Sequence, residues 1–185
     1  MTKRTILLIG GARSGKSSYA ENLARQIGGE VLFVATAEAR DEEMKARITA
    51  HQKSRPDHWH TLETPCNVGN CIAGDSRKYD TVVLDCVTLL VNNILCQHML
   101  ERGEEVDERA IEEDIKSEIG LITDGMLKSA ATYILVTNEV GEGIIPLGAT
   151  TRIYRDVLGR ANQMLAKACD EVFLMVAGIP LKVKP

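Results

Sequence analysis

Short apolar runs alternate with longer segments of helical periodicity along the chain. The runs occupy residues 5–9, 31–35, 81–84, 132–136 and 171–176. Runs that are apolar at nearly every position are typical of strands buried on both faces, as in parallel sheets. Their alternation with helices predicts an α/β fold in which helices flank a mainly parallel central sheet.

The intervening segments carry apolar stripes at helical spacing. Ala20, Leu23, Ala24 and Ile27 form such a stripe after the first run, and Gly28 supplies a stop signal. Segments 109–128 and 151–169 predict two longer helices that cover the sheet. A further helix follows the run at 81–84 and carries Asn92 and Asn93, which fit either a polar contact or a solvated face.

Two segments lack this regular pattern. Residues 65–79 contain Gly, Asn and Asp and read mostly as a loop. Residues 179–184 alternate apolar with basic side chains and contain Pro180, which favours an edge strand.

A glycine-rich loop joins the first predicted strand to the first helix. Its sequence is Gly10-Gly11-Ala12-Arg13-Ser14-Gly15-Lys16-Ser17, which completes the phosphate-binding pattern G-x-x-x-x-G-K-[ST]. The glycines let backbone N–H groups surround a polyphosphate, and the helix dipole favours the same anion. Lys16 would neutralise the β- and γ-phosphates, and the Ser17 hydroxyl would bind Mg²⁺. The loop predicts nucleoside triphosphate binding, not a particular reaction.

The run at 81–84 ends in a carboxylate, Asp85. In proteins with a phosphate-binding loop, such a residue holds Mg²⁺ opposite the loop hydroxyl. Asp85 could instead cap the next helix. Because the loop is complete, we expect the metal role.

Segment 41–54 predicts a helix with an unusual face. Met44, Ile48, His51 and Arg55 share that face, and Arg47 lies one turn before His51. Arginines near an imidazole attract phosphate, and a neutral imidazole is a nucleophile toward phosphorus. The same pattern is also typical of a packed histidine with a hydrogen-bonded ring nitrogen.

Composition narrows the class of protein. The chain has 185 residues, 44% of them hydrophobic, which suits one domain over 1–185. A net charge of -4, no basic run and few aromatic residues argue against a nucleic-acid partner. No apolar stretch approaches the length of a membrane span, so we expect a soluble, cytoplasmic protein.

The five cysteines form no C-x-x-C pair, and His58-Trp59-His60 has no partners spaced for a metal. We therefore expect reduced thiols and no structural zinc.

The order of these motifs resembles the bifunctional adenosylcobinamide kinase/adenosylcobinamide-phosphate guanylyltransferase family of cobalamin biosynthesis. The resemblance spans nearly the whole chain and is carried by the phosphate-binding loop, 41–48 ahead of His51, Arg55, Pro56, Trp59, 137–141, 144–146, 154–156, Gly159, Asn162 and Gln163. It implies a RecA-like P-loop fold, usually assembled as a homotrimer. It also implies ATP and GTP as substrates, together with Mg²⁺.

The resemblance further implies two reactions. The aminopropanol hydroxyl of adenosylcobinamide, a corrinoid, is phosphorylated, and GMP from GTP is then transferred onto that phosphate to give adenosylcobinamide-GDP. His51 matches the histidine that carries the GMP. The implied nucleotide contacts are the phosphate-binding loop, Ala35, Thr36, Ala37, Gln52, Lys53, Ser54, Arg55, Glu63 and Asp85.

Two positions depart from some relatives, which carry a second His at the position of Ala50 and Glu at that of Asp85. Neither change removes a required group. Glu139, which follows the run at 132–136, is expected to face the site because open α/β sheets bind ligands at the carboxyl ends of their strands.

Two other functions fit the loop alone. A P-loop small-molecule kinase would use His51 only structurally, and a RecA-like ATPase module would couple hydrolysis to a partner. Covalent labelling by GTP distinguishes the first, and stimulation by DNA or protein distinguishes the second.

Overall fold

The computed structural model describes residues 3–75, 78–102 and 107–184. Within them the strands form one seven-stranded sheet of order β3-β2-β4-β5-β1-β6-β7. The strands are β1 (Thr5–Gly10), β2 (Val31–Ala35), β3 (His60–Glu63), β4 (Thr81–Asp85), β5 (Thr132–Asn138), β6 (Glu171–Val176) and β7 (Ile179–Lys184). All neighbouring strands pair in parallel except β7, which is antiparallel to β6. The predicted α/β class is confirmed.

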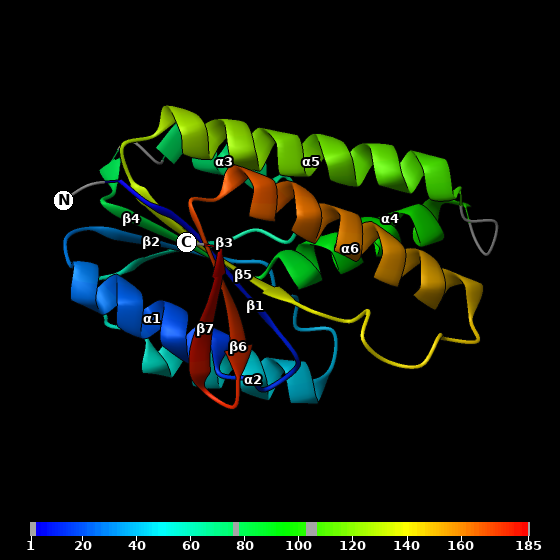
Figure 1. The fold of residues 1–185 in the computed structure, drawn as a ribbon, viewed down its shortest axis with the longest axis horizontal. Coiled ribbons are helices and arrows are strands. Elements are labelled where there is room, and N and C mark those ends of the chain that lie inside the picture. Colours follow the sequence, from blue (N-terminus) through cyan, green and yellow to red (C-terminus); the bar gives the residue numbers. More distant parts are fainter. Residues whose placement is uncertain (1–2, 76–77, 103–106, 185) are drawn as a thin grey trace.

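Helices cover both faces of this sheet (Figure 1). They are α1 (Lys16–Ile27), α2 (Glu42–Ser54), α3 (Val68–Asp75), α4 (Val87–Arg102), α5 (Glu108–Lys128) and α6 (Ala149–Ala168). In Figure 1, α1 and α2 lie below the sheet, whereas α3, α4, α5 and α6 lie above it.

Alternate residues of each central strand enter two different hydrophobic clusters. In β4, Val82 and Leu84 pack with α4, α5 and α6, while Val83 packs against α1 together with Trp59. Each of these valine and leucine side chains is buried. Burial on both faces is the physical reason why the strands read as continuous apolar runs.

The segment 65–79, expected to be mostly loop, contains α3, so that expectation was wrong. Gly69 and its neighbouring Asn and Gly residues have low helix propensity. Gly69 nevertheless packs so closely on α5 that a Cβ there would lie 2.4 Å from Leu121, and its N–H donates to Glu118 at 2.9 Å. Tertiary packing therefore overrides the local sequence preference.

The edges of the sheet differ in how well the sequence predicted them. The predicted edge strand at 179–184 is β7. The opposite edge, β3, was not predicted, because its four residues are mostly exposed and form no apolar run. Within the described chain, no helix is both long and apolar enough to cross a membrane.

Candidate active site

The phosphate-binding loop follows β1 and ends at the first residue of α1. Gly15, the residue before the helix, has φ of 92°, a left-handed conformation that favours glycine. Gly10 is equally constrained, because a Cβ there would lie 2.5 Å from the Met175 carbonyl of β6. Glycine is thus favoured at position 15 by the backbone conformation and at position 10 by the close approach of β6.

Lys16 is buried within this loop. Only 6% of the residue is exposed, and its Nζ donates to the Gly11 carbonyl at 2.6 Å and lies 3.3 Å from the Ser14 hydroxyl. The loop thus holds a cation among backbone groups that suit anionic oxygens.

Two connected cavities open at the carboxyl edge of the sheet. The first, here called the phosphate lobe, is lined by Arg13, Ser14, Gly15, Lys16, Ser17, Ser18, Glu43 and His51. The second, here called the apolar lobe, has a volume of about 240 Å³ and a largely apolar wall that includes Ala35, Ala37, Ala39, Met44, Ile48 and Leu89. Ser17 and His51 line both lobes, so they lie at the junction.

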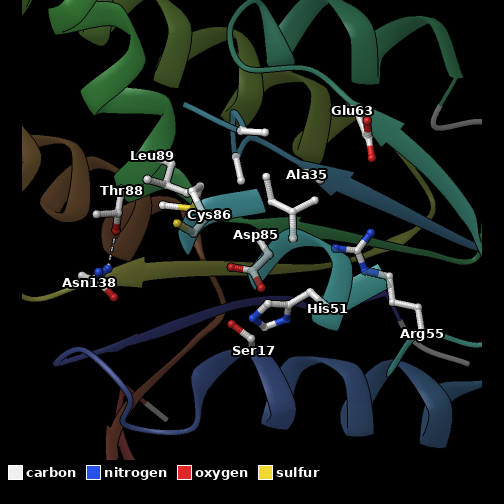
Figure 2. Close-up of a pocket in the computed structure, with 14 residues that line it drawn as sticks. Ser17, Ala35, His51, Arg55, Glu63, Asp85, Cys86, Thr88, Leu89 and Asn138 are labelled. Atoms are coloured by element: carbon white, nitrogen blue, oxygen red, sulfur yellow. Dashed lines mark hydrogen bonds between the residues drawn. The ribbon is translucent and has the colours of Figure 1, made fainter. Parts of the chain in front are cut away.

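His51 is positioned by α2. The helix begins after Asp41, whose carboxylate accepts a hydrogen bond from the Met44 N–H at 2.7 Å. From there Met44, Ile48 and His51 fall on one face, and all three line the apolar lobe, as the periodicity predicts. Figure 2 shows the imidazole close to Ser17 and Asp85.

Arg55 directs a cation into the apolar lobe from the end of α2 (Figure 2). Its guanidinium carbon lies 3.7 Å from the centre of the Phe33 ring. Burial lowers the pKa of Arg55, against the attraction of Asp85, Glu21 and Glu63. Its Nε and Nη1 are buried and have no hydrogen-bond partner within the described chain. Such an arrangement suits an anionic ligand, which would satisfy both nitrogens.

Asp85 and Cys86 line the apolar lobe from the end of β4. Thr36, at the end of β2, holds this corner: its hydroxyl accepts from the Cys86 N–H at 2.8 Å and donates to the Cys86 carbonyl at 2.7 Å. Burial raises the pKa of the Cys86 thiol to about 12. Because the thiolate is the nucleophilic form, this shift disfavours Cys86 as a nucleophile at neutral pH.

Glu63 lines the apolar lobe from the end of β3. Its Oε1 accepts a hydrogen bond from Gln52 Nε2 at 2.7 Å. Figure 2 shows Glu63 well separated from His51 and Ser17.

The predicted site residues therefore divide into groups. Those that line a lobe are Arg13, Ser14, Gly15, Lys16, Ser17, Ala35, Ala37, His51, Arg55, Glu63 and Asp85. Gly10 ends β1, and Gly11 and Ala12 lie between it and the phosphate lobe. Thr36 supports the wall of the apolar lobe through Cys86, and Gln52 contacts Glu63. Lys53 is exposed and lines neither lobe, while the side chains of Ser54 and Arg47 lie outside the described part of the structure.

Asn138 is a cavity residue that the sequence analysis did not identify. It ends β5, which lies between the loop-bearing β1 and the Asp85-bearing β4. Its N–H donates to the Thr88 hydroxyl at 2.6 Å, and its carbonyl accepts from Asn162 Nδ2 at 3.0 Å. The neighbouring Glu139 lines neither lobe, and its carboxylate accepts from the Gly141 N–H in its own loop.

Side chains that commonly bind metals do not cluster among the described residues. The five cysteines are free, and the described residues contain no cluster of three or more His, Cys, Asp or Glu that could hold a metal.

Fold and site together define a P-loop NTPase of RecA type. The chain is similar in structure to the RadB recombinase, with a TM-score of 0.51 and 13% identity, over 92% of this chain and 73% of that one. It is also similar to an ATPase from a bacterial type III secretion system, with a TM-score of 0.59 and 10% identity, over 94% of this chain and 52% of that one. At these identities the likeness shows the fold alone.

Sequence comparison identifies the family. Residues 6–183 match the model of the CobU family, described as cobinamide kinase / cobinamide phosphate guanyltransferase, and the chain belongs to this family. It is 42% identical to the bifunctional adenosylcobalamin biosynthesis protein CobU of Escherichia coli K12, over 97% of this chain and 99% of that protein. It is 43% identical to the Salmonella typhimurium protein of the same name, with the same coverage. It is 38% identical to the bifunctional adenosylcobalamin biosynthesis protein CobP of Pseudomonas aeruginosa, over 96% of each chain.

The two adjacent asparagines of α4 have different surroundings. Asn93 is buried, and its Nδ2 donates to the Thr36 carbonyl at 2.8 Å and to the Pro65 carbonyl at 3.0 Å. Its Oδ1 accepts from Arg40 at 3.2 Å. Asn93 therefore connects α4 by hydrogen bonds to the segments that follow β2 and β3.

Asn93→Ala is expected to lower the free energy of unfolding by about 1–3 kcal/mol, because one buried and one part-buried carbonyl lose their donor. Urea denaturation followed by circular dichroism measures the loss. Asn92→Ala, the adjacent control, should change it by less than about 0.5 kcal/mol. Equal effects of the two substitutions would contradict the assignment.

Proposed function

We propose that this protein is a bifunctional enzyme that phosphorylates adenosylcobinamide and transfers GMP from GTP onto the resulting phosphate. The observation that carries the proposal is the position of His51, which lines both the phosphate lobe and the apolar lobe. Membership of the family supports both activities. The product would be adenosylcobinamide-GDP.

Guanylyl transfer would proceed in two steps. The unprotonated imidazole nitrogen of His51 attacks the α-phosphorus of GTP, a P–N bond forms, and the bond from that phosphorus to the bridging oxygen breaks. Pyrophosphate is the leaving group, and it is released in the phosphate lobe, beside Lys16. Next, a phosphate oxygen of adenosylcobinamide phosphate attacks the same phosphorus, and the P–N bond breaks to restore His51. The covalent intermediate divides one transfer into two in-line steps.

The kinase reaction would use the same phosphate lobe. The aminopropanol hydroxyl attacks the γ-phosphorus of ATP or GTP, loses its proton, and displaces the nucleoside diphosphate. Lys16 and the loop N–H groups stabilise the negative charge that develops on the transferred phosphoryl group. Positioning by the lobe supplies most of the remaining rate enhancement.

Mg²⁺ is the expected metal. The hydroxyl of Ser17 and the carboxylate of Asp85 both line the apolar lobe, and such oxygen donors suit this ion. When bound, Mg²⁺ neutralises phosphate charge. The corrinoid and both nucleotides are cytoplasmic metabolites under this proposal, so we place the enzyme in the cytoplasm, with no nucleic acid among its partners.

We also propose that the protein assembles as a homotrimer, as the family resemblance implies. Support comes from an exposed apolar patch on the β6–β7 hairpin, formed by Val176, Ile179, Leu181 and Val183, each more than half exposed. Ile179, Leu181 and Val183 alternate along β7 and so share one face of the strand. Contiguous exposed apolar residues are typical of protein interfaces.

GTP labelled at the α-phosphorus should leave covalent label on the protein, whereas γ-labelled GTP should leave none. The bond should be acid-labile and base-stable, as expected of a phosphoramidate. His51→Ala should lose the label and guanylyl transfer but retain kinase activity, since γ-phosphoryl transfer to an alcohol needs no covalent enzyme intermediate. Autoradiography of the denatured protein measures the label.

His58→Ala, His60→Ala and His98→Ala are the matched controls and should keep the label. If His51→Ala is still labelled, or still forms the GDP adduct at the parent rate, the covalent mechanism is wrong. The simple kinase then becomes the better assignment.

Asp85→Asn should raise the Mg²⁺ concentration needed for half-maximal activity by roughly 10-fold or more in both reactions, because one negative charge near the metal is lost. A Mg²⁺ titration of initial rates measures the change. Asp80→Asn, at the opposite end of β4, is the control. Overlapping titrations of Asp85→Asn and the parent would leave Asp85 without a metal role.

Leu181→Glu should convert the proposed trimer to smaller species, since burying the new carboxylate in an apolar contact costs several kcal/mol. Sedimentation equilibrium gives the mass directly. Leu127→Glu, at an exposed leucine on α5 outside the patch, should leave it unchanged. A parent protein that sediments as a monomer would refute the assembly.

A further inference from the structure

Glu63 occupies a defined place across the sheet. The strand register aligns Glu63 of β3 with Ala35 of β2, then with Asp85 of β4 and Val136 of β5. Strands in a sheet lie about 4.8 Å apart, so Glu63 is roughly 10 Å from Asp85 at the backbone. It lies on the side away from β1, which carries the phosphate-binding loop.

This placement fixes which part of a bound nucleotide approaches Glu63, given the proposed function. The β- and γ-phosphates occupy the phosphate lobe, and the α-phosphorus must lie at His51 for the transfer to occur. The nucleoside then extends through the apolar lobe, away from β1. Ala35, Met44 and Ile48 provide apolar walls there, which suit the faces of a flat base.

A hydrogen bond from Gln52 orients the carboxylate of Glu63. Gln52 Nε2 donates to its Oε1 at 2.7 Å, and Gln52 is one residue after His51 on α2. A carboxylate has about four acceptor positions, so this bond leaves capacity on both oxygens. Glu63 therefore presents acceptors, and no donor, toward the end of the lobe where the base lies.

We propose that Glu63 is the residue that selects guanine, its two carboxylate oxygens accepting hydrogen bonds from guanine N1–H and from the exocyclic 2-amino group. Guanine is the purine that offers two adjacent donors on this edge. Adenine presents an unprotonated N1 and no 2-amino group, so the same carboxylate would face a lone pair without a proton between them. The selection follows because guanine offers donors to both carboxylate oxygens, whereas adenine leaves an acceptor facing an acceptor.

Glu63→Gln changes the hydrogen-bonding groups that face the base. The amide keeps one acceptor for N1–H but replaces the other with a donor, which suits the 2-oxo group of xanthine rather than the 2-amino group of guanine. The half-saturating concentration of GTP in covalent labelling should rise about 10- to 100-fold. The corresponding value for xanthosine triphosphate should fall by a similar factor, with the limiting labelling rate changed much less.

Two measurements test this exchange. One is the rate of covalent labelling by α-labelled GTP, ATP and xanthosine triphosphate over a range of concentrations. The other is equilibrium binding of GTP and xanthosine triphosphate to the His51→Ala protein, with and without Glu63→Gln, by calorimetry. The second needs no turnover. Glu30→Gln, a change of an exposed carboxylate next to β2 that lines neither lobe, is the control and should keep the preference for GTP.

The outcomes separate this inference from the proposed function. A parent protein that takes no label from GTP refutes the proposed function itself. A labelled parent whose Glu63→Gln variant keeps its preference for GTP overturns only the role of Glu63. Loss of GTP binding with no gain for xanthosine triphosphate also overturns it, because that result is expected if Glu63 binds the ribose hydroxyls instead.

Discussion

Parallel pairing of β1, β5, β4, β2 and β3 is the constraint on which the site depends. Because these strands run in the same direction, their carboxyl ends meet at one edge of the sheet. The loop after β1 and the last residues of β5, β4 and β3 are far apart in sequence but line one pair of connected lobes. These last residues are Asn138, Asp85 and Glu63. A slip of one residue in any of these pairings would turn that strand's terminal side chain to the other face of the sheet.

Buried hydrogen bonds then hold the loops that leave this edge. Thr36 bridges the end of β2 to Cys86, and Asn93 bridges Thr36 to the segment after β3. Thr137 donates to Asn162 at 2.7 Å and so fixes the end of β5 against α6. Since these hydrogen bonds are buried or part-buried, an alternative loop position would leave donors or acceptors without partners. These hydrogen bonds therefore favour one position for the segments that follow β2, β4 and β5.

The sequence predicted most of this arrangement, and its failures have physical causes. The runs at 31–35 and 171–176 match β2 and β6 to the residue, because both strands are largely covered by neighbours. β3 carries no apolar run because it is an exposed edge, and α3 is stabilised by contact with α5 rather than by propensity. In the site, helical spacing correctly grouped Met44, Ile48, His51 and Arg55. Glu139 was expected to face the site because it follows the apolar run that ends at Val136. Pairing of Asn138 with Gly10 extends β5 by two residues, and Asn138 lines the lobe instead.

Trp59 gives the site an optical property. It is the sole tryptophan of the chain, it is buried, and its ring stacks on Phe33 with centroids 6.4 Å apart. The same Phe33 ring carries the Arg55 guanidinium, whose Nε and Nη1 have no hydrogen-bond partner within the described residues. An anion that draws Arg55 away from Phe33 would therefore alter the surroundings of the ring on which Trp59 stacks. We therefore expect the emission of Trp59 to change when an anion binds in the apolar lobe, without an added dye.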